Sequence, residues 1–322
     1  MASADASFRR YFRWRPAQGV SLIVMDAPPE HEALDAYLQV TELLRSAGVH
    51  APQLHEVDSE QGFILLEDLG STPYLTALRE PGRAPAMYAA AQLALSQMQL
   101  QLPAGTLSLP AYDAAMLRRE MELMPHWFCD RHLGLELSDE DRDFLALTMG
   151  QLVEVALEQP KVFVHRDYHS RNLMLLPQDG PGVIDYQDAV TGPVTYDLVS
   201  LFKDCYIRWP RESVERWVRD YHLLLRARGR ADLAGSATEF LRWFDFMGVQ
   251  RHLKVLGIFA RLHWRDGKSG YLADLPLTLD YLLETCSRYV ALQPLAGWLD
   301  ERVAPQLAAA NARAQQAAKG VG

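Results

Sequence analysis

The chain has 322 residues, of which 49% are hydrophobic and 23% charged, as in an ordinary soluble globular protein. Its formal net charge of −9 at pH 7 argues against nucleic acid as a partner, because phosphate backbones require a concentrated basic surface. No apolar run approaches the roughly 20 residues that a membrane-spanning helix requires, and the first residues lack the apolar core of a signal peptide.

The first predicted strand interleaves arginine with aromatic residues. Residues 7–15 read Ser-Phe-Arg-Arg-Tyr-Phe-Arg-Trp-Arg, and a second strand is expected over residues 21–25 after a turn that contains Pro16 and Gly19. Two interpretations are equally compatible with this spacing. In one interpretation, the strand pair faces the phosphate groups of a ligand. In the other, the first strand lies at a sheet edge, and its charges protect that edge from aggregation.

A helix and two further strands are predicted next. The helix begins at Pro28, shows apolar residues at helical spacing and ends at Gly48, a typical C-terminal glycine. Short strands are expected over residues 54–57 and 62–66. The polar segment 67–70, Glu-Asp-Leu-Gly, then interrupts the pattern, and we interpret it as a hinge.

From Thr72 onward the sequence is mainly helical. A capping box at Ser138 predicts a helix that runs to about Gln159. Further amphipathic stretches cover residues 113–130, 211–228, 238–264 and 277–292. The tail from Ala304 is rich in alanine, glutamine and arginine, which is typical of either a fraying helix or a disordered segment.

Residues 162–185 contain the most informative pattern. A β-branched and aromatic run, residues 162–164, predicts a short buried strand that leads into His165-Arg166-Asp167. Asn172 follows, then a strand over residues 173–176, a Pro-Gln-Asp-Gly turn and a return strand that ends at Asp185. Because Asn172 opens one strand of this hairpin and Asp185 closes the other, we expect their side chains to converge.

This convergence indicates phosphoryl-transfer chemistry. An amide oxygen from Asn172 and a carboxylate from Asp185 are hard ligands that suit Mg²⁺ when phosphate oxygens complete its coordination shell. Asp167 is then placed to accept a proton from a hydroxyl group that attacks phosphorus. The pattern H-R-D-x-x-x-x-N with a later strand-end aspartate is typical of kinases. The alternative, a loop of satisfied polar residues without chemistry, fits this combination of spacings less well.

These elements predict an α+β, bilobal protein-kinase-like fold with a small β-rich N-lobe and a mainly helical C-lobe. Residues 1–69, hinge included, are expected to form the nucleotide-binding lobe. Residues 70–322 are expected to carry the catalytic loop and the substrate site. ATP and Mg²⁺ are the expected cofactors.

Three features separate the sequence from protein kinases. The N-terminal region contains no G-x-G-x-x-G motif, and His169 stands two residues after Asp167. Asp197 follows Asp185 by only twelve residues, which is little room for a segment that docks a polypeptide. These features resemble the aminoglycoside phosphotransferase and choline kinase superfamily of small-molecule kinases, and the block 165–198 is the most specific part of the resemblance.

Four segments resemble one family within it more closely, the bacterial anomeric kinases of N-acetylmuramate and N-acetylglucosamine. They are residues 7–13, 25–29, 65–70 and 250–262. The resemblance implies ATP-dependent phosphorylation of the C1 hydroxyl of these amino sugars during peptidoglycan recycling. Another small-molecule acceptor, such as choline or an aminoglycoside, is the alternative. The motif positions imply catalytic roles for Asp167 and His169, and metal ligation by Asn172 and Asp185.

The nucleotide site departs from the usual kinase pattern. Kinases carry a lysine on the third strand that holds the α- and β-phosphates, whereas Met25 occupies the corresponding place here. One interpretation is a pseudokinase that only binds nucleotide. The other is that neighbouring residues supply the contacts, and the expected nucleotide-binding set is Ser7, Arg9, Arg10, Arg13, Glu67 and Leu69. The last two would offer backbone groups to adenine.

A basic pair bears on the substrate class. Arg251 and Lys254 lie three residues apart and therefore share a helix face. This pair suits an anion such as the lactyl carboxylate of N-acetylmuramate, whereas choline requires an aromatic cage and aminoglycosides require carboxylates. Asp167 would also contact the sugar. The alternative is a solvated charged face.

Partners and compartment follow from composition. The expected partner is a small-molecule amino sugar, with no nucleic acid, no membrane and no obligate protein partner. The three cysteines, Cys129, Cys205 and Cys286, lack metal-ligand spacing. We therefore expect reduced thiols in a cytoplasmic protein.

Overall fold

In the computed structural model, the described residues are 3–4, 8–31, 34–102, 104–106, 108–177 and 180–319. They form two compact units. Unit 1 comprises Met1–Pro110 and Val162–Thr191, and unit 2 comprises Ala111–Lys161 and Gly192–Gly322. The predicted catalytic stretch therefore belongs to the same unit as the N-terminal sheet. The predicted division into residues 1–69 and 70–322 concerns nucleotide and substrate binding, and it stays a prediction.

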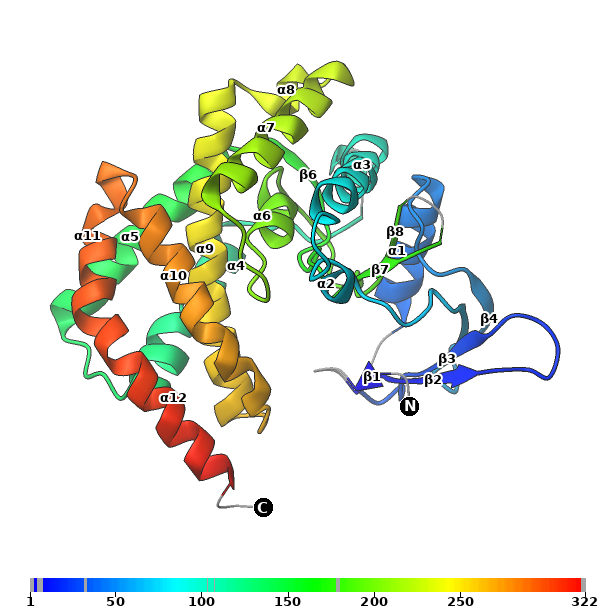
Figure 1. Ribbon diagram of the computed structural model, residues 1–322, viewed down its shortest axis with the longest axis horizontal. Coiled ribbons are helices and arrows are strands. Elements are labelled where there is room, and N and C mark those ends of the chain that lie inside the picture. The colour runs from blue at the N-terminus through cyan, green and yellow to red at the C-terminus, as the bar shows by residue number, and fades with distance from the viewer. Residues whose placement is uncertain are drawn as a thin grey trace. The chain divides into compact units, whose positions relative to one another are not determined.

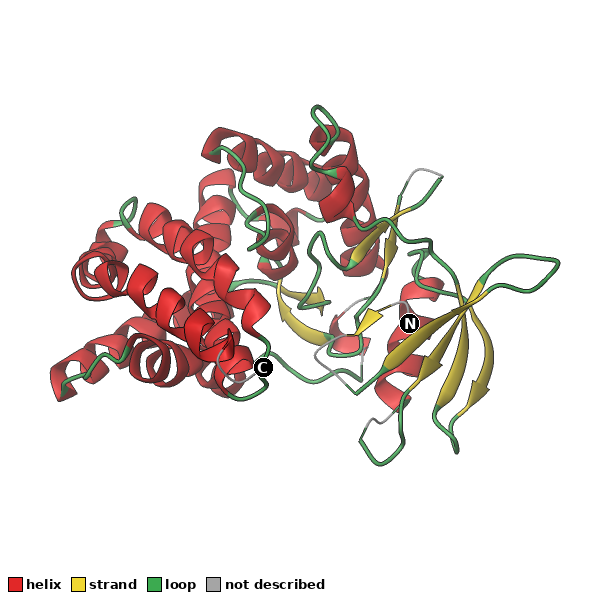
Figure 2. Cartoon of the chain, turned by 60° about the horizontal axis from the view of Figure 1, so that its bottom comes forward, coloured by secondary structure: helices red, strands yellow, loops and turns green. Residues whose placement is uncertain are grey.

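Unit 1 contains a five-stranded antiparallel sheet in the order β1-β2-β3-β5-β4 (Figure 2). The strands are β1 (Ser3–Ala4), β2 (Arg10–Trp14), β3 (Leu22–Asp26), β4 (Leu54–Asp58) and β5 (Phe63–Glu67). The four strands predicted in this region are confirmed, with bounds shifted by a few residues. Glu67, expected in the hinge, is the last residue of β5, so the polar break begins at Asp68.

The sheet has two faces that differ in burial. Side chains alternate along β2, because successive residues of a strand point to opposite sides. Tyr11 pairs with Met25 of β3, and Met25 pairs with Ile64 of β5; we call their side the inner face. The next row, Phe12, Val24 and Leu65, defines the outer face. Met25 and Ile64 are buried, whereas Phe12 is exposed.

Helix α1 (Asp35–Ser46) ends as expected but begins later than expected. Gly48 follows it with φ +77°, a left-handed conformation that glycine adopts at low cost. The predicted start at Pro28 is wrong, because His31 donates a backbone hydrogen bond to Pro28 and this segment forms a turn. Helices α2 (Tyr74–Ala77) and α3 (Ala84–Gln101) and the short η1 (Ala104–Thr106) complete the first part of unit 1.

The catalytic stretch folds as two strand pairs. β6 (Lys161–Val164) pairs with β9 (Val190–Pro193), and β7 (Leu173–Leu175) pairs with β8 (Pro181–Val183) (Figure 1). The predicted hairpin is therefore confirmed, although its return strand ends at Val183 and not at Asp185. Residues 178–179 of its turn lie outside the described residues. Backbone hydrogen bonds join the hairpin to the rest of unit 1, from Leu175 to Thr72, from Leu75 to Ser170 and from Val183 to His50.

Unit 2 is helical. Its elements are α4 (Ala114–Met121), η2 (Met124–Leu133), α5 (Asp139–Glu158), α6 (Tyr196–Phe202), α7 (Arg211–Ala227), α8 (Ala231–Ala234), α9 (Ala237–Trp264), η3 (Ser269–Asp274), α10 (Leu275–Cys286), η4 (Val290–Leu292), α11 (Gln293–Trp298), η5 (Leu299–Val303) and α12 (Ala304–Lys319). The capping box at Ser138 is confirmed, and the tail is helical through Lys319. The predicted stretch 113–130 is divided at residues 122–123 into α4 and a π-helical segment.

Helix α9 is the centre of unit 2. It contacts η2, α10, α5 and α6, and most of its residues are buried. Gly257 permits the contact with η2, because a Cβ atom there would lie 2.4 Å from the carbonyl carbon of Leu123. Within the described ranges, no helix combines the length and apolar character needed to cross a membrane.

Candidate active site

The catalytic loop begins where a buried strand ends. Val162, Phe163 and Val164 of β6 are buried, and they fix the point from which the loop leaves the core. Arg166 (φ +76°) and Asp185 (φ +65°) are the only non-glycine residues with positive φ in the described part of the chain. Such strained positions persist where the surrounding structure enforces them, typically at functional sites.

His165 holds this loop against the end of the hairpin. Its Nε2 lies 3.1 Å from the carbonyl oxygen of Ile184, and its Nδ1 accepts a hydrogen bond of 3.3 Å from the backbone N–H of Asp167. Burial lowers the pKa of His165 to about 4, although the Asp167 carboxylate opposes this shift. The ring is therefore neutral at pH 7 and donates through Nε2, so His165 has a structural role in this loop.

The three residues of the predicted catalytic set meet in this loop. The Asn172 side-chain nitrogen donates to the Asp167 carbonyl oxygen at 3.0 Å and to Asp185 Oδ2 at 3.1 Å. Gln187 donates to Asp185 Oδ1 at 3.0 Å. The backbone N–H of Ile184 donates to the Asn172 carbonyl oxygen at 3.1 Å. The expected convergence of Asn172 and Asp185 is thus observed.

These contacts suit a cation that also binds phosphate. The amide nitrogen of Asn172 donates to Asp167 and Asp185, so its oxygen is the atom that would ligate a metal, and metal ligation by Asn172 and Asp185 stays a prediction. One amide oxygen and one carboxylate match the way Mg²⁺ is bound in phosphoryl-transfer sites, where phosphates and water complete the shell. No group of three or more His, Cys, Asp or Glu side chains able to hold a metal occurs among the described residues.

His169 stands at the turn of the same loop. Its backbone N–H donates to the Asp167 carbonyl oxygen at 2.9 Å, and its own carbonyl oxygen accepts from the backbone N–H of Asn172 at 2.9 Å. The side chains of Asp167 and His169 are both half-buried. The turn therefore fixes the backbone on which Asp167 is carried, and the catalytic role of the His169 ring stays a prediction.

The arginines near β2 separate into different environments. Arg10 lies on the outer face and pairs with Asp26 at 2.5 Å. Arg13 lies on the inner face and forks onto Asp68 through two hydrogen bonds of 2.7 and 3.0 Å. Arg9 is buried, and its guanidinium carbon lies 5.8 Å from the centre of the Tyr37 ring. Ser7, also predicted to bind nucleotide, lies outside the described residues.

The hinge is held through the Asp68 side chain. Asp68 accepts hydrogen bonds from Arg13, from Ser21 Oγ at 2.6 Å and from the backbone N–H of Gly70 at 3.0 Å. Partial burial alone would raise the pKa of Asp68, but these bonds outweigh it and hold the pKa below its usual value. Sequence reasoning missed this role of Asp68, because 55 positions separate it from Arg13 and no local pattern predicts the pairing.

The two hinge residues predicted to contact adenine have structural roles as well. The Glu67 carboxylate lies 2.8 Å from His50 Nε2 and accepts from the Gln53 backbone N–H at 3.0 Å. The Leu69 side chain packs on β8, where a Cβ atom at Gly182 would lie 2.9 Å from Leu69 Cδ1. Their backbone groups stay the predicted contacts to adenine.

The basic pair of α9 is buried. Arg251 is 4% exposed and Lys254 is 6% exposed, so the alternative of a solvated charged face is wrong. Lys254 Nζ forms an ion pair of 3.1 Å with Glu120 and donates to the Tyr196 hydroxyl at 3.0 Å. Arg251 donates to Cys205 Sγ at 3.7 Å. Both basic residues belong to unit 2, and their contact with a sugar stays a prediction.

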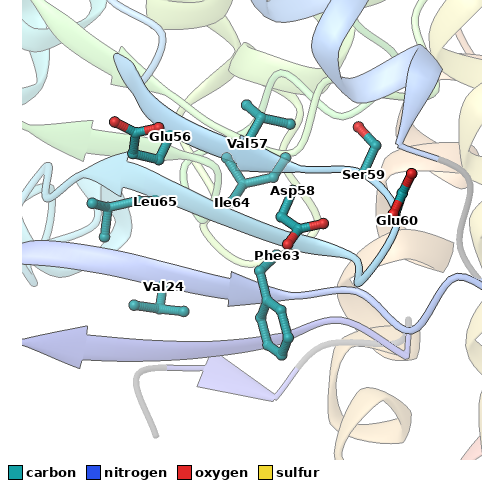
Figure 3. Close-up of a pocket in the computed structure, with 9 residues that line it drawn as sticks. All are labelled: Val24, Glu56, Val57, Asp58, Ser59, Glu60, Phe63, Ile64 and Leu65. Carbon is teal, nitrogen blue, oxygen red and sulfur yellow. The ribbon is translucent and has the colours of Figure 1, made fainter.

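A hollow on the outer face of the sheet does not have the required chemistry. It encloses about 560 Å³ and is lined by residues of β3, β4, β5 and the β4–β5 turn (Figure 3). Its polar side chains are Glu56, Asp58, Ser59 and Glu60, while Val24 and Phe63 contribute apolar surface. None of the catalytic-loop residues lines this hollow, so the hairpin is the candidate active site.

Comparison with known proteins identifies the family of this chain. Residues 2–235 match the phosphotransferase enzyme family. The N-acetylmuramate/N-acetylglucosamine kinase of Pseudomonas aeruginosa is 49% identical over 91% of this chain and 85% of its own length. The enzyme of the same name from Pseudomonas putida is 47% identical over 93% of this chain and 87% of its own length.

The solved structures bear on the fold. An ADP-bound aminoglycoside phosphotransferase matches with a TM-score of 0.55 and 12% identity over 85% of this chain and 92% of that chain. This match confirms the predicted α+β, kinase-like fold. The predicted resemblance is confirmed by the family match and by the Pseudomonas relatives.

Proposed function

This chain belongs to the phosphotransferase enzyme family, and we propose that it transfers the γ-phosphoryl group of ATP to the C1 hydroxyl of N-acetylmuramate and N-acetylglucosamine. The two Pseudomonas relatives are named as kinases of these amino sugars, and they match most of this chain. This similarity supports the proposed acceptors. The observation that supports the chemistry best is the meeting of Asp167, Asn172 and Asp185 in one hairpin.

Asp167 is the proposed base. An anomeric hydroxyl is more acidic than an ordinary alcohol, so a carboxylate suffices to accept its proton as the bond to phosphorus forms. In a loose, metaphosphate-like transition state the protein contributes mainly positioning. The bond from the Asp167 backbone N–H to His165 and the bond from Asn172 to the Asp167 carbonyl oxygen supply that positioning.

Asn172 and Asp185 are the proposed ligands of Mg²⁺. The bound ion would neutralise charge on the β- and γ-phosphate oxygens as it develops in the transition state. The chain's own contribution is to hold the two ligands at a fixed separation, through the bond from Asn172 to Asp185 and the bond from Gln187 to Asp185. The left-handed backbone at Asp185 directs its carboxylate toward Asn172.

Adenine is proposed to bind to backbone groups of the hinge. Arg13, Ser21 and the Gly70 N–H fix the Asp68 carboxylate, so the hinge backbone has little freedom before nucleotide binds. A rigid hinge lowers the entropy that is lost on binding. The phosphate contacts of the nucleotide require cationic groups.

The carboxylate of N-acetylmuramate is proposed to bind near Arg251. Lys254 shares the helix face, but its ion pair with Glu120 balances its charge inside the protein. A compensated lysine attracts a further anion less strongly. We therefore assign the larger part of carboxylate recognition to Arg251 and a positioning role to Lys254.

The proposed setting is the cytoplasm, where an ATP-dependent kinase would return recovered cell-wall amino sugars to synthesis. The three cysteines are buried and unpaired with one another, as expected in a reducing compartment. Burial raises the pKa of Cys286 to about 12 and also raises the pKa of Cys205, so these thiols stay protonated and unreactive.

The test is an acceptor panel. The enzyme is incubated with radiolabelled ATP and Mg²⁺ in the presence of N-acetylmuramate, N-acetylglucosamine, choline or an aminoglycoside. We expect label in the two amino sugars and none in the other acceptors. Transfer to choline or the aminoglycoside alone would contradict the proposed acceptor. Nucleotide binding without transfer to any acceptor would favour the pseudokinase alternative, which Met25 raises.

A further inference from the structure

The inner face of the sheet lacks the usual phosphate-binding lysine. Met25 of β3 occupies its place; it is fully buried and lies between Tyr11 and Ile64 in register. A thioether does not compensate the negative charge of a diphosphate. If the chain transfers a phosphoryl group as proposed above, another cation must approach the α- and β-phosphates from this face.

Arg10 and Arg13 both point in other directions. Arg10 lies on the opposite, outer face. There it forms an ion pair with Asp26, the residue opposite it in the register between β2 and β3. Arg13 forks onto Asp68 and also donates to the Gly70 carbonyl oxygen at 2.7 Å, so its donors hold the hinge. Neither environment directs the guanidinium toward the phosphates of a nucleotide whose adenine contacts the hinge.

Arg9 differs from both in its position. It directly precedes β2, and Arg9, Tyr11 and Arg13 are alternate residues of this segment. Because alternate residues of a strand share a face, Arg9 lies on the inner face with Met25. It is 6% exposed, and its guanidinium lies over the ring of Tyr37 on α1. A guanidinium keeps its charge at such burial, whereas the pKa of a buried lysine falls readily.

The Tyr37 ring connects Arg9 to the proposed metal site. Tyr37 stacks on Tyr186 with ring centres 5.2 Å apart and planes 21° apart, and Tyr186 directly follows Asp185. Thr41 of α1 hydrogen-bonds to the Tyr186 hydroxyl at 2.8 Å.

We propose that Arg9 binds the α- and β-phosphates of the nucleotide in place of the strand lysine, and that Tyr37 positions it as a helix glutamate positions that lysine in other kinases. A guanidinium can stack on an aromatic face and still direct N–H groups at phosphate oxygens in its plane. The Tyr37–Tyr186 stack would then align the phosphate-binding cation with Asp185. This inference rests on the proposed phosphoryl transfer.

The test compares ligands with and without phosphates. Calorimetry with Mg²⁺ measures the binding of ADP and of adenosine to wild type, Arg9→Gln and Arg9→Lys. Loss of a charge-assisted contact should weaken ADP binding about 10- to 100-fold in Arg9→Gln, and adenosine binding should stay unchanged. Arg9→Lys keeps the charge and should lose less. The control is Arg15→Gln, an exposed arginine of the same segment, which should bind both ligands as wild type does.

A second variant tests the equivalence of the two positions. Adding Met25→Lys to Arg9→Gln returns a lysine to the strand and should recover part of the ADP affinity, with thermal melting used to verify the fold. Three results would overturn the proposal: undiminished ADP binding in Arg9→Gln, equal losses for ADP and adenosine in that variant, or a folded double variant with no recovery. Because no sugar is present, failure of the proposed acceptor would not alter these outcomes.

Discussion

The catalytic hairpin and the buried centre of helix α9 both gather polar side chains, but they hold them in different ways. In the hairpin, hydrogen bonds of 3.0 and 3.1 Å from the Asn172 side chain to the Asp167 carbonyl oxygen and to Asp185 fix the geometry of two proposed oxygen ligands. In the helical unit, Asp245 accepts from Arg211 at 2.5 and 2.7 Å and from Lys203 at 3.0 Å. Its charge is compensated within the protein.

The difference indicates what each region contributes. The non-glycine residues with positive φ in the described part of the chain, Arg166 and Asp185, both belong to the hairpin segment. Strain of this kind is retained for function and offset by the rest of the fold. The Asp245 network instead joins α7, α9 and α10 through buried groups. Changes in the hairpin should therefore affect turnover, and changes in the network should affect stability.

The largest expected effect is that of Asp167→Asn. Removing the proposed base should lower kcat about 100- to 10,000-fold, while ADP affinity and melting temperature stay near wild type, because the backbone bonds of this loop are kept. Steady-state kinetics, calorimetry and melting curves provide the three readouts. Near-normal turnover would show that another group accepts the proton.

Asp245→Asn should have the opposite profile. It leaves Lys203 and Arg211 buried without a full counter-charge, which costs about 3–5 kcal/mol of unfolding free energy. Urea unfolding measures this loss, and kcat per folded molecule should be unchanged. A variant that kept its stability but lost turnover would contradict the separation of the two regions.

The network around Asp245 also predicts how the stability of the protein changes at low pH. Burial alone would raise the pKa of Asp245, but Lys203 and Arg211 outweigh it and lower the pKa to about 2. Because the folded-state pKa is below the unfolded one, this stability is present above pH about 4 and is lost as the pH falls toward 2. Asp245→Asn should show a weaker loss over this interval, and an identical pH profile in both proteins would contradict the assignment.

Asp185→Asn tests the hairpin at its metal ligand. Asparagine tolerates the left-handed backbone at this position, so the fold should persist. ADP affinity in the presence of Mg²⁺ should fall about 10- to 100-fold, because a charged contact to the ion is lost. The ADP affinities measured with and without Mg²⁺ should differ in wild type and should be similar to each other in the variant. An undiminished Mg²⁺ effect would remove Asp185 from the metal site.

The smallest effect is expected on acceptor preference. Arg251→Gln should lower kcat/KM for N-acetylmuramate relative to N-acetylglucosamine by about 10-fold, the value of one charge-assisted hydrogen bond. Lys254→Gln should change this ratio less, because Glu120 already balances the lysine. If the ratio were the same in wild type and both variants, the carboxylate would bind elsewhere.

The hairpin was predictable from sequence because its information is local. The spacing of Asp167, Asn172 and Asp185 and the turn between the strands define which ends meet. The partners of Arg10 and Arg13 were not predictable in this way. Alternation assigns the two arginines to opposite faces, but it does not indicate which carboxylate each would contact. Lys254 meets Glu120 across 134 positions of sequence, and no local pattern predicts that pairing.

The two helix errors also have physical reasons. The helix predicted to start at Pro28 begins at Asp35, because Pro28 and His31 close a turn. The stretch 113–130 has helical periodicity throughout, but its second half continues as a π-helical segment with Pro125 in its first turn. Proline is tolerated there because the first N–H groups of a helix have no partner within it.

The most direct test of the account is the position of the transferred phosphoryl group. Phosphorus NMR of the product formed from N-acetylglucosamine, ATP and Mg²⁺ distinguishes a phosphate on the anomeric carbon from one on C6, through its coupling to the sugar protons. We predict a C1 phosphate with wild type and at most a trace of it with Asp167→Asn. A C6 phosphate, or equal product from both proteins, would contradict the anomeric kinase built on this hairpin.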